Sequence, residues 1–310
     1  FKKTKKTLKK SINSNKFEDL TQMNTAITDD NEGQFDASFV GKLGGEDIIL
    51  PATTARPYPL RAHFWPTTAP FKGYFLILPG FTEFCEKYAL TARRLVKQGY
   101  SCLIIDWPGQ GLSGHCGKDP LAVHCDDFAD YLDALDAVIE TIGLGGENLI
   151  LFGHSMGGHL ALRYAKRRPS QIIGVILSAP MMAPPIMPVW LIRALSGLLV
   201  NFGLCYAFPP FYRVTSLDLL RDFQPENPLT RYPEGYESQF IWFDDMPELR
   251  RGGPTIGWVN AAYRSTAHYT LNREWLMSVR VPVLALVAGD ERVVSSPATD
   301  YALSLIPNVE

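Results

Sequence analysis

One ten-residue stretch, LILFGHSMGG at positions 149–158, constrains the fold of this chain more than any other feature. Its apolar run stops at Gly153, and a helix-forming segment, LALRYA, follows at 160–165. Residues 153–157 fit G-x-S-x-G, the pattern of a nucleophile on a sharp strand-to-helix turn. Glycines flank Ser155 because Cβ atoms at those positions would collide with the neighbouring backbone. A plain Gly/Ser turn is the alternative, and the strand and helix around the motif argue against it.

A serine nucleophile also needs an oxyanion hole made of convergent N–H groups. The turn aims the first N–H groups of the following helix at the serine, so one donor is predicted to be the backbone N–H of Met156. The second is predicted in the loop PGFTE at 79–83, which follows an apolar strand. There Gly80 allows a tight turn that leaves the Phe81 N–H free. From this loop alone, a glycine turn with no catalytic role is an equally good interpretation.

Composition places the chain among ordinary globular proteins. It has 310 residues, 46% hydrophobic and 20% charged, with a net charge of -2. This length suits one large α/β domain with an insertion, or two domains. The near-neutral charge gives no indication of a nucleic-acid partner, and no apolar run reaches the length of a membrane-spanning helix. Five scattered cysteines without C-x-x-C argue against a disulfide framework or a zinc site, and we predict no cofactor.

The first 35 residues are polar and begin with a cluster of lysines. No acidic residue precedes Glu18, and the basic residues are Lys2, Lys3, Lys5, Lys6, Lys9 and Lys10. The simplest interpretation is a solvated, disordered tail. The alternative is an electrostatic contact with an anionic membrane, since each lysine near such a surface contributes about 1 kcal/mol.

Strand-like and helix-like segments alternate along most of the chain. Apolar strands are predicted at 47–50, 60–65, 74–78, 101–105, 148–152, 172–177 and 281–287, with helices at 83–98 and 127–142 among them. Near-continuous apolar strands separated by helices predict a mostly parallel, doubly wound α/β sheet. The domain prediction is therefore a core at 36–180 and 275–310 with an insertion at 181–274.

The insertion is rich in proline and aromatic residues, and it carries an apolar stripe at helical spacing. The stripe consists of Leu191, Leu195, Leu198, Leu199 and Phe202. We expect most of these residues on the core-facing side of an inserted helix. The functional interpretation is a cap that lines an apolar pocket over the active site.

Three motifs together resemble a known family. PGFTE at 79–83, IIDWPGQGLSG at 104–114 and GHSMGG at 153–158 occur in the order and at the spacing of the serine α/β-hydrolases. Within these, the chain is similar to the bacterial lysophospholipase and monoacylglycerol lipase group, also described as serine aminopeptidase-like. The resemblance implies the α/β-hydrolase fold with a helical cap. It departs from the family at Pro79, where members usually carry histidine.

The resemblance also implies an acidic residue after the strand at 281–287. In the family this acid precedes an arginine and a pair of small apolar residues, so the resemblance assigns the role of the triad acid to Glu291. Asp290 is the rival, because aspartate is the more usual residue type, although it is one position out of register.

A serine hydrolase of this family uses a triad of serine, acid and histidine, and the motifs above do not identify the histidine that acts as the base. Chain order in the family is serine, acid, histidine, which places the histidine after position 291. The six histidines are His63, His115, His124, His154, His159 and His268. We therefore expect the base beyond Glu310, together with a last strand and helix, with His268 as the one conceivable substitute. On this expectation the 310-residue chain hydrolyses esters weakly or not at all.

Three functions are compatible with these features. The first is a carboxylic ester hydrolase acting on a lysophospholipid or monoacylglycerol through an acyl-serine intermediate, in the cytoplasm or peripheral to the inner membrane. The second is an aminopeptidase, whose amine site would use Asp244, Asp245 or Glu248. The third is a non-catalytic acyl-binding module. Epoxide hydrolase or dehalogenase chemistry is disfavoured, because those relatives have aspartate at the position of Ser155.

Overall fold

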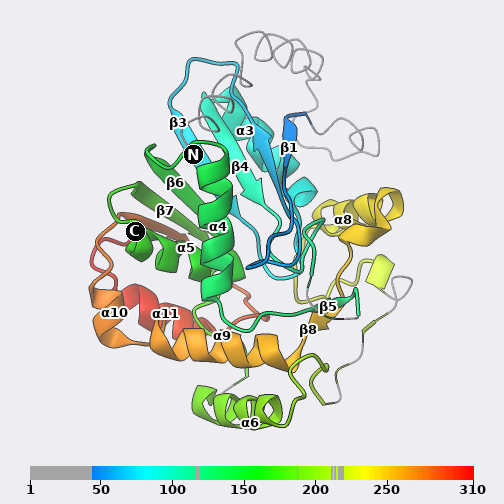
Figure 1. The fold of residues 1–310 in the computed structure, drawn as a ribbon. Helices are drawn as coiled ribbons and strands as arrows, with labels where there is room; N and C mark the ends of the chain where they lie inside the picture. The colour runs from blue at the N-terminus through cyan, green and yellow to red at the C-terminus, as the bar shows by residue number, and fades with distance from the viewer. Residues whose placement is uncertain are drawn as a thin grey trace.

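A seven-stranded sheet forms the centre of the molecule in the computed structural model (Figure 1). The structure describes residues 44–310 except Cys116, Lys118, Met187, Phe211, Arg213 and 216–219, so the predicted lysine-rich tail lies outside the described residues. The strands are β1 Glu46–Leu50, β2 Leu60–Trp65, β3 Gly73–Leu78, β4 Tyr100–Ile105, β6 Leu149–His154, β7 Ile172–Ser178 and β9 Val283–Leu286. Their order is β1-β2-β4-β3-β6-β7-β9.

The sheet is mostly parallel, as the sequence predicts. Strands β4, β3, β6, β7 and β9 run parallel, and β1 and β2 pair antiparallel at one edge. All seven strands predicted from the sequence are confirmed, with bounds that differ by at most two residues at either end. A short second sheet, β5 Ala122–Val123 with β8 Gly253–Pro254, was not predicted.

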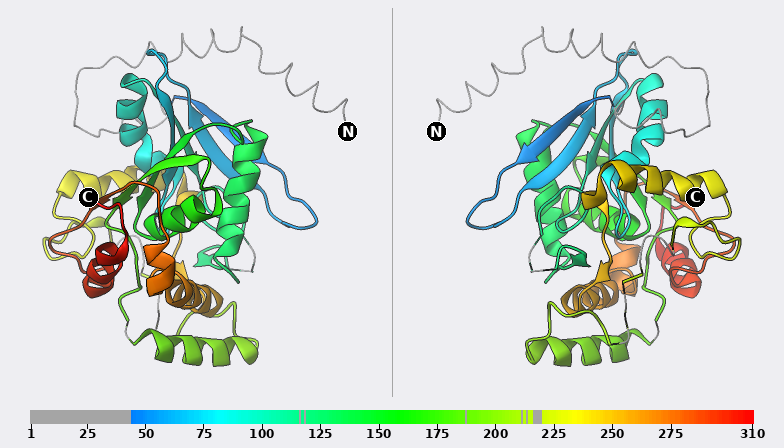
Figure 2. Two further views of the ribbon diagram at one scale, coloured as in Figure 1. Left: turned by 90° about the vertical axis from the view of Figure 1, so that its left-hand side faces the viewer. Right: turned by 90° about the vertical axis from the view of Figure 1, so that its right-hand side faces the viewer.

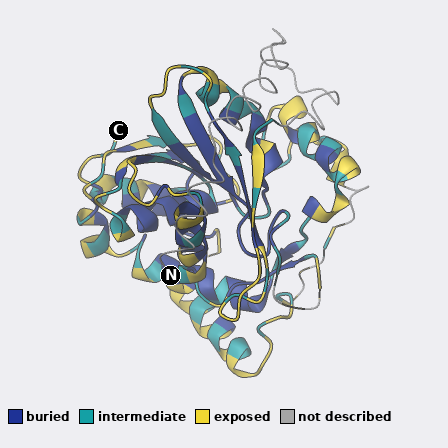
Figure 3. Cartoon of the chain, turned by 45° about the horizontal axis from the view of Figure 1, so that its top comes forward, coloured by how far each residue is buried: buried dark blue, intermediate teal, exposed yellow. Residues whose placement is uncertain are grey.

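Helices cover both faces of the sheet, and the alternation of β3 side chains shows the two layers. Leu76 and Leu78 belong to one apolar cluster, whereas Phe75 and Ile77 belong to the other. The first cluster includes residues of α4 Ala129–Thr141, α5 Met156–Arg167, α9 Ile256–His268, α10 Arg273–Met277 and α11 Ser296–Leu305. The second includes residues of the 3-10 helix η2 Cys85–Tyr88, α3 Ala89–Lys97, α8 Pro233–Asp245 and the 3-10 helix η3 Pro247–Leu249. Figure 3 shows the strands between these layers as largely buried.

The sheet continues beyond β9 with the last residues of the chain. Residues 308–310 run parallel to β9, with a bridge between Val283 and Val309. The Ala285 N–H donates to the Glu310 carbonyl at 2.8 Å, and the Glu310 N–H donates to the Val283 carbonyl at 2.9 Å. The expected last strand, histidine loop and helix concern residues beyond this point and stay a prediction.

Helix α6, Val189–Asn201, lies outermost, on the far side of α9 from the sheet (Figure 2). The expectation that its apolar stripe faces the core is wrong, because Leu195, Leu198 and Phe202 are 50%, 53% and 73% exposed. The helix packs on α9 through small residues instead. Ser196 is buried, and its hydroxyl accepts a hydrogen bond from Asn260 Nδ2 at 3.2 Å. Small side chains let two helices approach closely, so the larger apolar residues are left on the outer face.

Within the described residues, no helix is long and apolar enough to cross a membrane.

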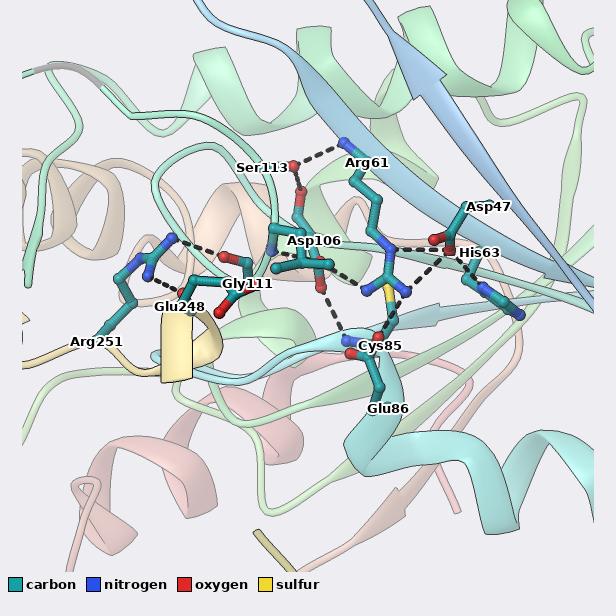
Figure 4. A network of polar contacts seen from close by, with 11 residues as sticks. Asp47, Arg61, His63, Cys85, Glu86, Asp106, Gly111, Ser113, Glu248 and Arg251 are labelled. Carbon is teal, nitrogen blue, oxygen red and sulfur yellow. Dashed lines mark hydrogen bonds and ion pairs between the residues drawn. The ribbon is translucent and has the colours of Figure 1, made fainter. Parts of the chain in front are cut away.

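A cluster of charged residues around the buried Arg61 joins the strands to neighbouring loops, and Asp47 is its one exposed acidic member among the carboxylates that contact Arg61 (Figure 4). Arg61 on β2 is 2% exposed, and its guanidinium contacts three carboxylates. The nitrogen-to-oxygen distances are 2.9 Å to Asp47, 2.5 Å to Glu86 and 3.0 Å to Asp106. Burial raises the pKa of Glu86, partly offset by its hydrogen bond from Arg61. A single cation therefore holds three acidic groups from three separate segments.

Asp106, at the end of β4, shares its carboxylate between two loops. Its Oδ1 accepts a hydrogen bond from the Cys85 N–H, and its Oδ2 accepts one from the Leu112 N–H, both at 2.8 Å. Gly111 is required beside it, because a Cβ atom there would lie 2.2 Å from the Asp106 carboxyl carbon and its φ is +52°. The motif at 104–114 is thus a loop folded around one buried carboxylate.

Replacing Arg61 with alanine is expected to lower the free energy of unfolding by about 3–5 kcal/mol, because Asp106 and Glu86 would be left as buried, uncompensated carboxyl groups. Urea unfolding at pH 7 measures the change. Arg292→Ala is the matched control, since Arg292 makes its ion pairs with Asp290 and Glu226 at the surface. We expect that control to lose less than about 1 kcal/mol. Equal losses in the two variants would show that the buried cluster contributes no more than a surface pair.

Candidate active site

Ser155 lies on a strained turn between β6 and α5. Its φ is +50° and its ψ is -117°, a conformation that non-glycine residues rarely adopt. The flanking glycines are sterically required. A Cβ atom on Gly157 would lie 1.8 Å from the Leu78 carbonyl oxygen, and one on Gly153 would lie 2.5 Å from the Gly157 carbonyl oxygen. The turn therefore has the geometry of a nucleophile elbow, with β3 packed directly against it.

Two backbone N–H groups beside this turn are available to a ligand. Among the described residues, neither the Phe81 N–H nor the Met156 N–H donates to a protein acceptor. Met156 is the first residue of α5, where helix geometry leaves N–H groups unpaired. Phe81 lies in the loop after β3, and its ring packs on Trp258 of α9 with ring centroids 4.4 Å apart. These are the two donors that the sequence predicts.

Hydrogen bonds from three directions brace the loop at 79–83. The Trp107 indole N–H donates to the Pro79 carbonyl at 2.9 Å, and the Gly80 N–H donates to Glu83 Oε2 at 2.6 Å. The Thr82 N–H donates to Gln110 Oε1, and Thr82 has a φ of +61°. With these groups paired, Phe81 is the residue of the loop whose N–H stays open.

Glu83 is the main anchor of this loop, and sequence reasoning missed it. The residue is 8% exposed. Its carboxylate accepts hydrogen bonds from the Gly80 N–H and the Tyr88 hydroxyl, and it contacts Lys87 Nζ at 2.7 Å. Burial alone would raise the pKa of Glu83, but Lys87, His154 and the hydrogen bonds lower it to about 2. The one available signal was the spacing of four residues between Glu83 and Lys87.

The two candidate acids have different partners. Glu291 Oε1 accepts hydrogen bonds from the Val293 and Val294 N–H groups at 2.7 and 3.0 Å, which fixes its carboxylate on the turn after β9. Asp290 contacts Arg231 at 2.5 Å and Arg292 at 3.0 Å, and these hydrogen bonds lower its pKa. Both oxygens of Asp290 are thus used by surface arginines, whereas Glu291 Oε2 forms no hydrogen bond with another described residue.

No histidine forms a hydrogen bond with the Ser155 hydroxyl within the described part of the chain, which includes all six. His154 accompanies the elbow but lies within hydrogen-bonding distance of the Ser178 carbonyl, 3.1 Å from its Nδ1. His159 is fully buried between Ser265 and Thr270, and burial holds its pKa well below the usual range. His268 is exposed at the end of α9, where its ring makes an edge contact with that of Tyr269. Likewise, no group of acidic, histidine or cysteine side chains among these residues is arranged to hold a metal ion.

The sequence profile of the family described as "Serine aminopeptidase, S33" matches residues 69–308. The chain belongs to this family. The match extends from the segment before β3 to the residues alongside β9, so it includes the turn of Ser155, the loop at 79–83 and the turn of Glu291. The resemblance to lysophospholipases and monoacylglycerol lipases is also confirmed by individual relatives.

Two curated relatives show the range of similarity. Lysophospholipase L2 of Escherichia coli K12 is 29% identical over 239 residues, which cover 73% of this chain and 65% of the relative. The match thus spans about two thirds of the relative's own length. A monoacylglycerol lipase of Mycolicibacterium smegmatis is 29% identical over 145 residues, covering 46% of this chain and 45% of the relative.

Solved structures share the fold. A soluble variant of the Saccharomyces cerevisiae monoglyceride lipase, solved with a substrate analogue, superposes with a TM-score of 0.64 at 19% identity, covering 86% of this chain and 84% of that one. A carboxyl esterase of Bacillus coagulans gives a TM-score of 0.65 at 14% identity, covering 86% and 88%. At such identities the likeness establishes the α/β-hydrolase fold, as the sequence predicts.

We expect Glu83→Gln to weaken the fold in a pH-dependent way. The pKa of Glu83 is about 2 in the folded state, below the ordinary value of 4.5, so its contribution is present above pH 4.5 and is lost as the pH falls towards 2. The full contribution is about 3 kcal/mol. Unfolding followed by circular dichroism from pH 7 to 2 should show a shallower acid loss in the variant. An exposed glutamate, Glu274→Gln, is the control, and an acid profile identical to wild type in Glu83→Gln would contradict the assignment.

Proposed function

We propose that this chain is a serine ester hydrolase that transfers the acyl group of a lysophospholipid or monoacylglycerol to Ser155 and then to water. The observation that carries the proposal is the strained Ser155 turn with two unpaired N–H groups beside it. The similarity to a lysophospholipase and to a monoacylglycerol lipase supports the substrate class.

The proposed reaction steps follow from the positions of Ser155 and of the Phe81 and Met156 N–H groups. Ser155 Oγ attacks the ester carbonyl, and the Phe81 and Met156 N–H groups stabilise the negative charge that develops on the carbonyl oxygen. The glycerol-containing alcohol leaves with a proton, and the acyl group stays on Oγ. Water then attacks the acyl-serine, releasing the fatty acid and restoring the hydroxyl. Each of the two oxyanion donors is expected to contribute about 3–4 kcal/mol to transition-state stabilisation.

We assign Glu291 the role of orienting and stabilising the base, and the base itself to a histidine outside those described. Two N–H groups of its own turn hold Glu291 Oε1, so this carboxylate is positioned without help from the histidine. Because no described histidine is hydrogen-bonded to Ser155, we expect slow turnover by the 310-residue chain. Serine hydrolases without a working triad keep about 10³–10⁴-fold acceleration over water from binding and the oxyanion hole.

We also propose that residues 181–274 act as a cap on a core made of 36–180 and 275–310. Trp258 of α9 packs on Phe81, so the insertion contacts the oxyanion loop directly. The aminopeptidase alternative needs a free carboxylate for the substrate amine, and Asp244 does not offer one because Arg221 engages it at 2.5 Å. Among the described residues no ion pair involves Asp245 or Glu248, so these two remain the candidates for that alternative.

A fluorophosphonate probe tests the nucleophile. We expect slow covalent labelling of the 310-residue chain and none of Ser155→Ala, because the label attaches to Ser155 Oγ. Equal labelling of the two proteins would refute the assignment, whereas no labelling of either would support the acyl-binding alternative. Comparing a lysophospholipid, a monoacylglycerol and an aminoacyl amide as substrates then separates ester from peptide hydrolysis.

Imidazole in solution tests the base. If the described residues lack only the base, added imidazole should accelerate p-nitrophenyl ester hydrolysis by wild type at least several-fold over the imidazole-catalysed rate, which Ser155→Ala measures. His268→Ala should respond like wild type. A wild-type rate that is already high and falls on replacing His268 would instead assign the base to that residue.

A further inference from the structure

Arg251 lies just before β8, in the segment proposed as the cap, and its side chain reaches the core loop that follows β4 (Figure 4). Its Nε donates to the Gly109 carbonyl at 2.9 Å, and its Nη2 donates to the Gly111 carbonyl at 2.6 Å. Its Nη1 donates to the Glu248 carbonyl at 2.5 Å and to the Arg250 carbonyl at 2.9 Å. One side chain therefore joins a turn of the insertion to a loop of the core.

The acceptors of Arg251 in these four hydrogen bonds are all backbone carbonyl oxygens. Within the described residues, no carboxylate forms an ion pair with its partly buried guanidinium. Burial lowers the pKa of Arg251, and the charge of Asp106 partly offsets this effect. A planar guanidinium presents its N–H donors as a rigid fork, so it restrains the carbonyl groups that it bridges. The contact is therefore suited to holding backbone in place.

The two core carbonyls that Arg251 holds belong to the residues immediately before and after Gln110. Gln110 is fully buried, and its Oε1 accepts the Thr82 N–H. Its Nε2 has no hydrogen-bond partner within the described residues. The Gln110 amide thus has a single hydrogen bond, so its position depends on the backbone that carries it. That backbone is the part of the loop that Arg251 grips on both sides.

Thr82 follows the residue whose N–H we assign to the oxyanion hole, Phe81. Its φ of +61° is a conformation that a non-glycine residue keeps only where its surroundings hold it. The Thr82 N–H belongs to the peptide group that follows Phe81. Its hydrogen bond to Gln110 therefore restrains the backbone on the carboxyl side of the proposed donor.

We propose that Arg251 is a positioning residue for the oxyanion loop. By holding the carbonyls on both sides of Gln110, it keeps the Gln110 amide where it accepts the Thr82 N–H, and this contact holds the Phe81 N–H open towards the substrate. The insertion thus acts on the oxyanion loop through a residue of the core. The inference rests on the proposed function in one respect, the role of the Phe81 N–H.

Hydrogen–deuterium exchange of the full chain, measured at single amides by fragmentation mass spectrometry, tests the positioning without any catalysis. Arg251→Ala should speed exchange of the Thr82 amide about fivefold, the effect expected for one lost hydrogen bond. Gln110→Ala should have the same effect, and the double variant should add little to either, because both act on one contact. The Gly80 amide, whose acceptor is Glu83, is the internal reference and should exchange as in the wild type.

Arg250→Ala is the matched control. This neighbouring arginine donates to the Thr215 carbonyl within the insertion, so we expect wild-type exchange at Thr82. Arg251→Lys keeps the charge, but its ammonium has three donors and no rigid fork for four carbonyl groups. It should also speed exchange, and it decides the question if Arg251→Ala does not fold in thermal unfolding. Wild-type Thr82 exchange in every folded Arg251 variant would overturn the proposal, as would additive effects of Arg251→Ala and Gln110→Ala.

The rate of fluorophosphonate labelling at Ser155 tests the link to the oxyanion hole. We expect Arg251→Lys to label about tenfold more slowly than the wild type, because small displacements near the reacting atoms are costly. In imidazole-assisted ester hydrolysis, kcat should fall while KM stays nearly unchanged. Equal labelling despite fast Thr82 exchange would overturn the inference. No labelling of the wild type would contradict the function proposed for Ser155, while the exchange rates would still decide whether Arg251 holds the loop.

Discussion

The buried contact between Arg61 and Asp106 is the interaction on which the arrangement of the loops depends. Arg61 lies on β2, in the antiparallel part of the sheet, while Asp106 directly follows the parallel strand β4. By accepting the Cys85 and Leu112 N–H groups, Asp106 fixes both the residues after the oxyanion loop and the loop at 106–114. Without a buried cation, a carboxylate at this position would be neutral or solvated, and neither loop would have its present anchor.

Buried polar groups also hold the loop at 79–83, closer to Ser155. Gln110, in the loop folded around Asp106, accepts the Thr82 N–H, and Glu83 accepts the Gly80 N–H. The loop that bears Phe81 is therefore held on both sides of that residue by buried polar groups. Preorganised donors are effective because they need not reorient when charge develops on the substrate. Pro79 stands where relatives usually have histidine, and here the loop is braced instead through its carbonyl by Trp107 and through Glu83.

The sequence was sufficient for features that depend on local pattern. Apolar runs predicted the strands, since a strand covered on both faces must be apolar throughout, and the glycines around Ser155 predicted the elbow. The sequence did not predict the orientation of α6, because periodicity shows that a helix has an apolar side but not which way that side points. It also missed Gln110, whose contact with Thr82 spans 28 positions and has no periodic signal. Small residues such as Ser196 determined the packing side, which an apolar stripe alone does not reveal.

The proposed catalytic machinery has two parts, Ser155 with its oxyanion donors and the acid Glu291, and different groups fix the position of each. Ser155 and the two proposed oxyanion donors lie at the ends of the central strands β3 and β6 and on the first turn of α5. Glu291 is fixed by the N–H groups of its own turn at the edge beside β9, where residues 308–310 add to the sheet. Since no described histidine is hydrogen-bonded to Ser155 or Glu291, the strained serine and the two N–H groups beside it form without a base in place. In the proposed mechanism, substrate binding and proton transfer are thus separable, and a base supplied from solution needs only to reach the turn at Ser155, which is formed without it.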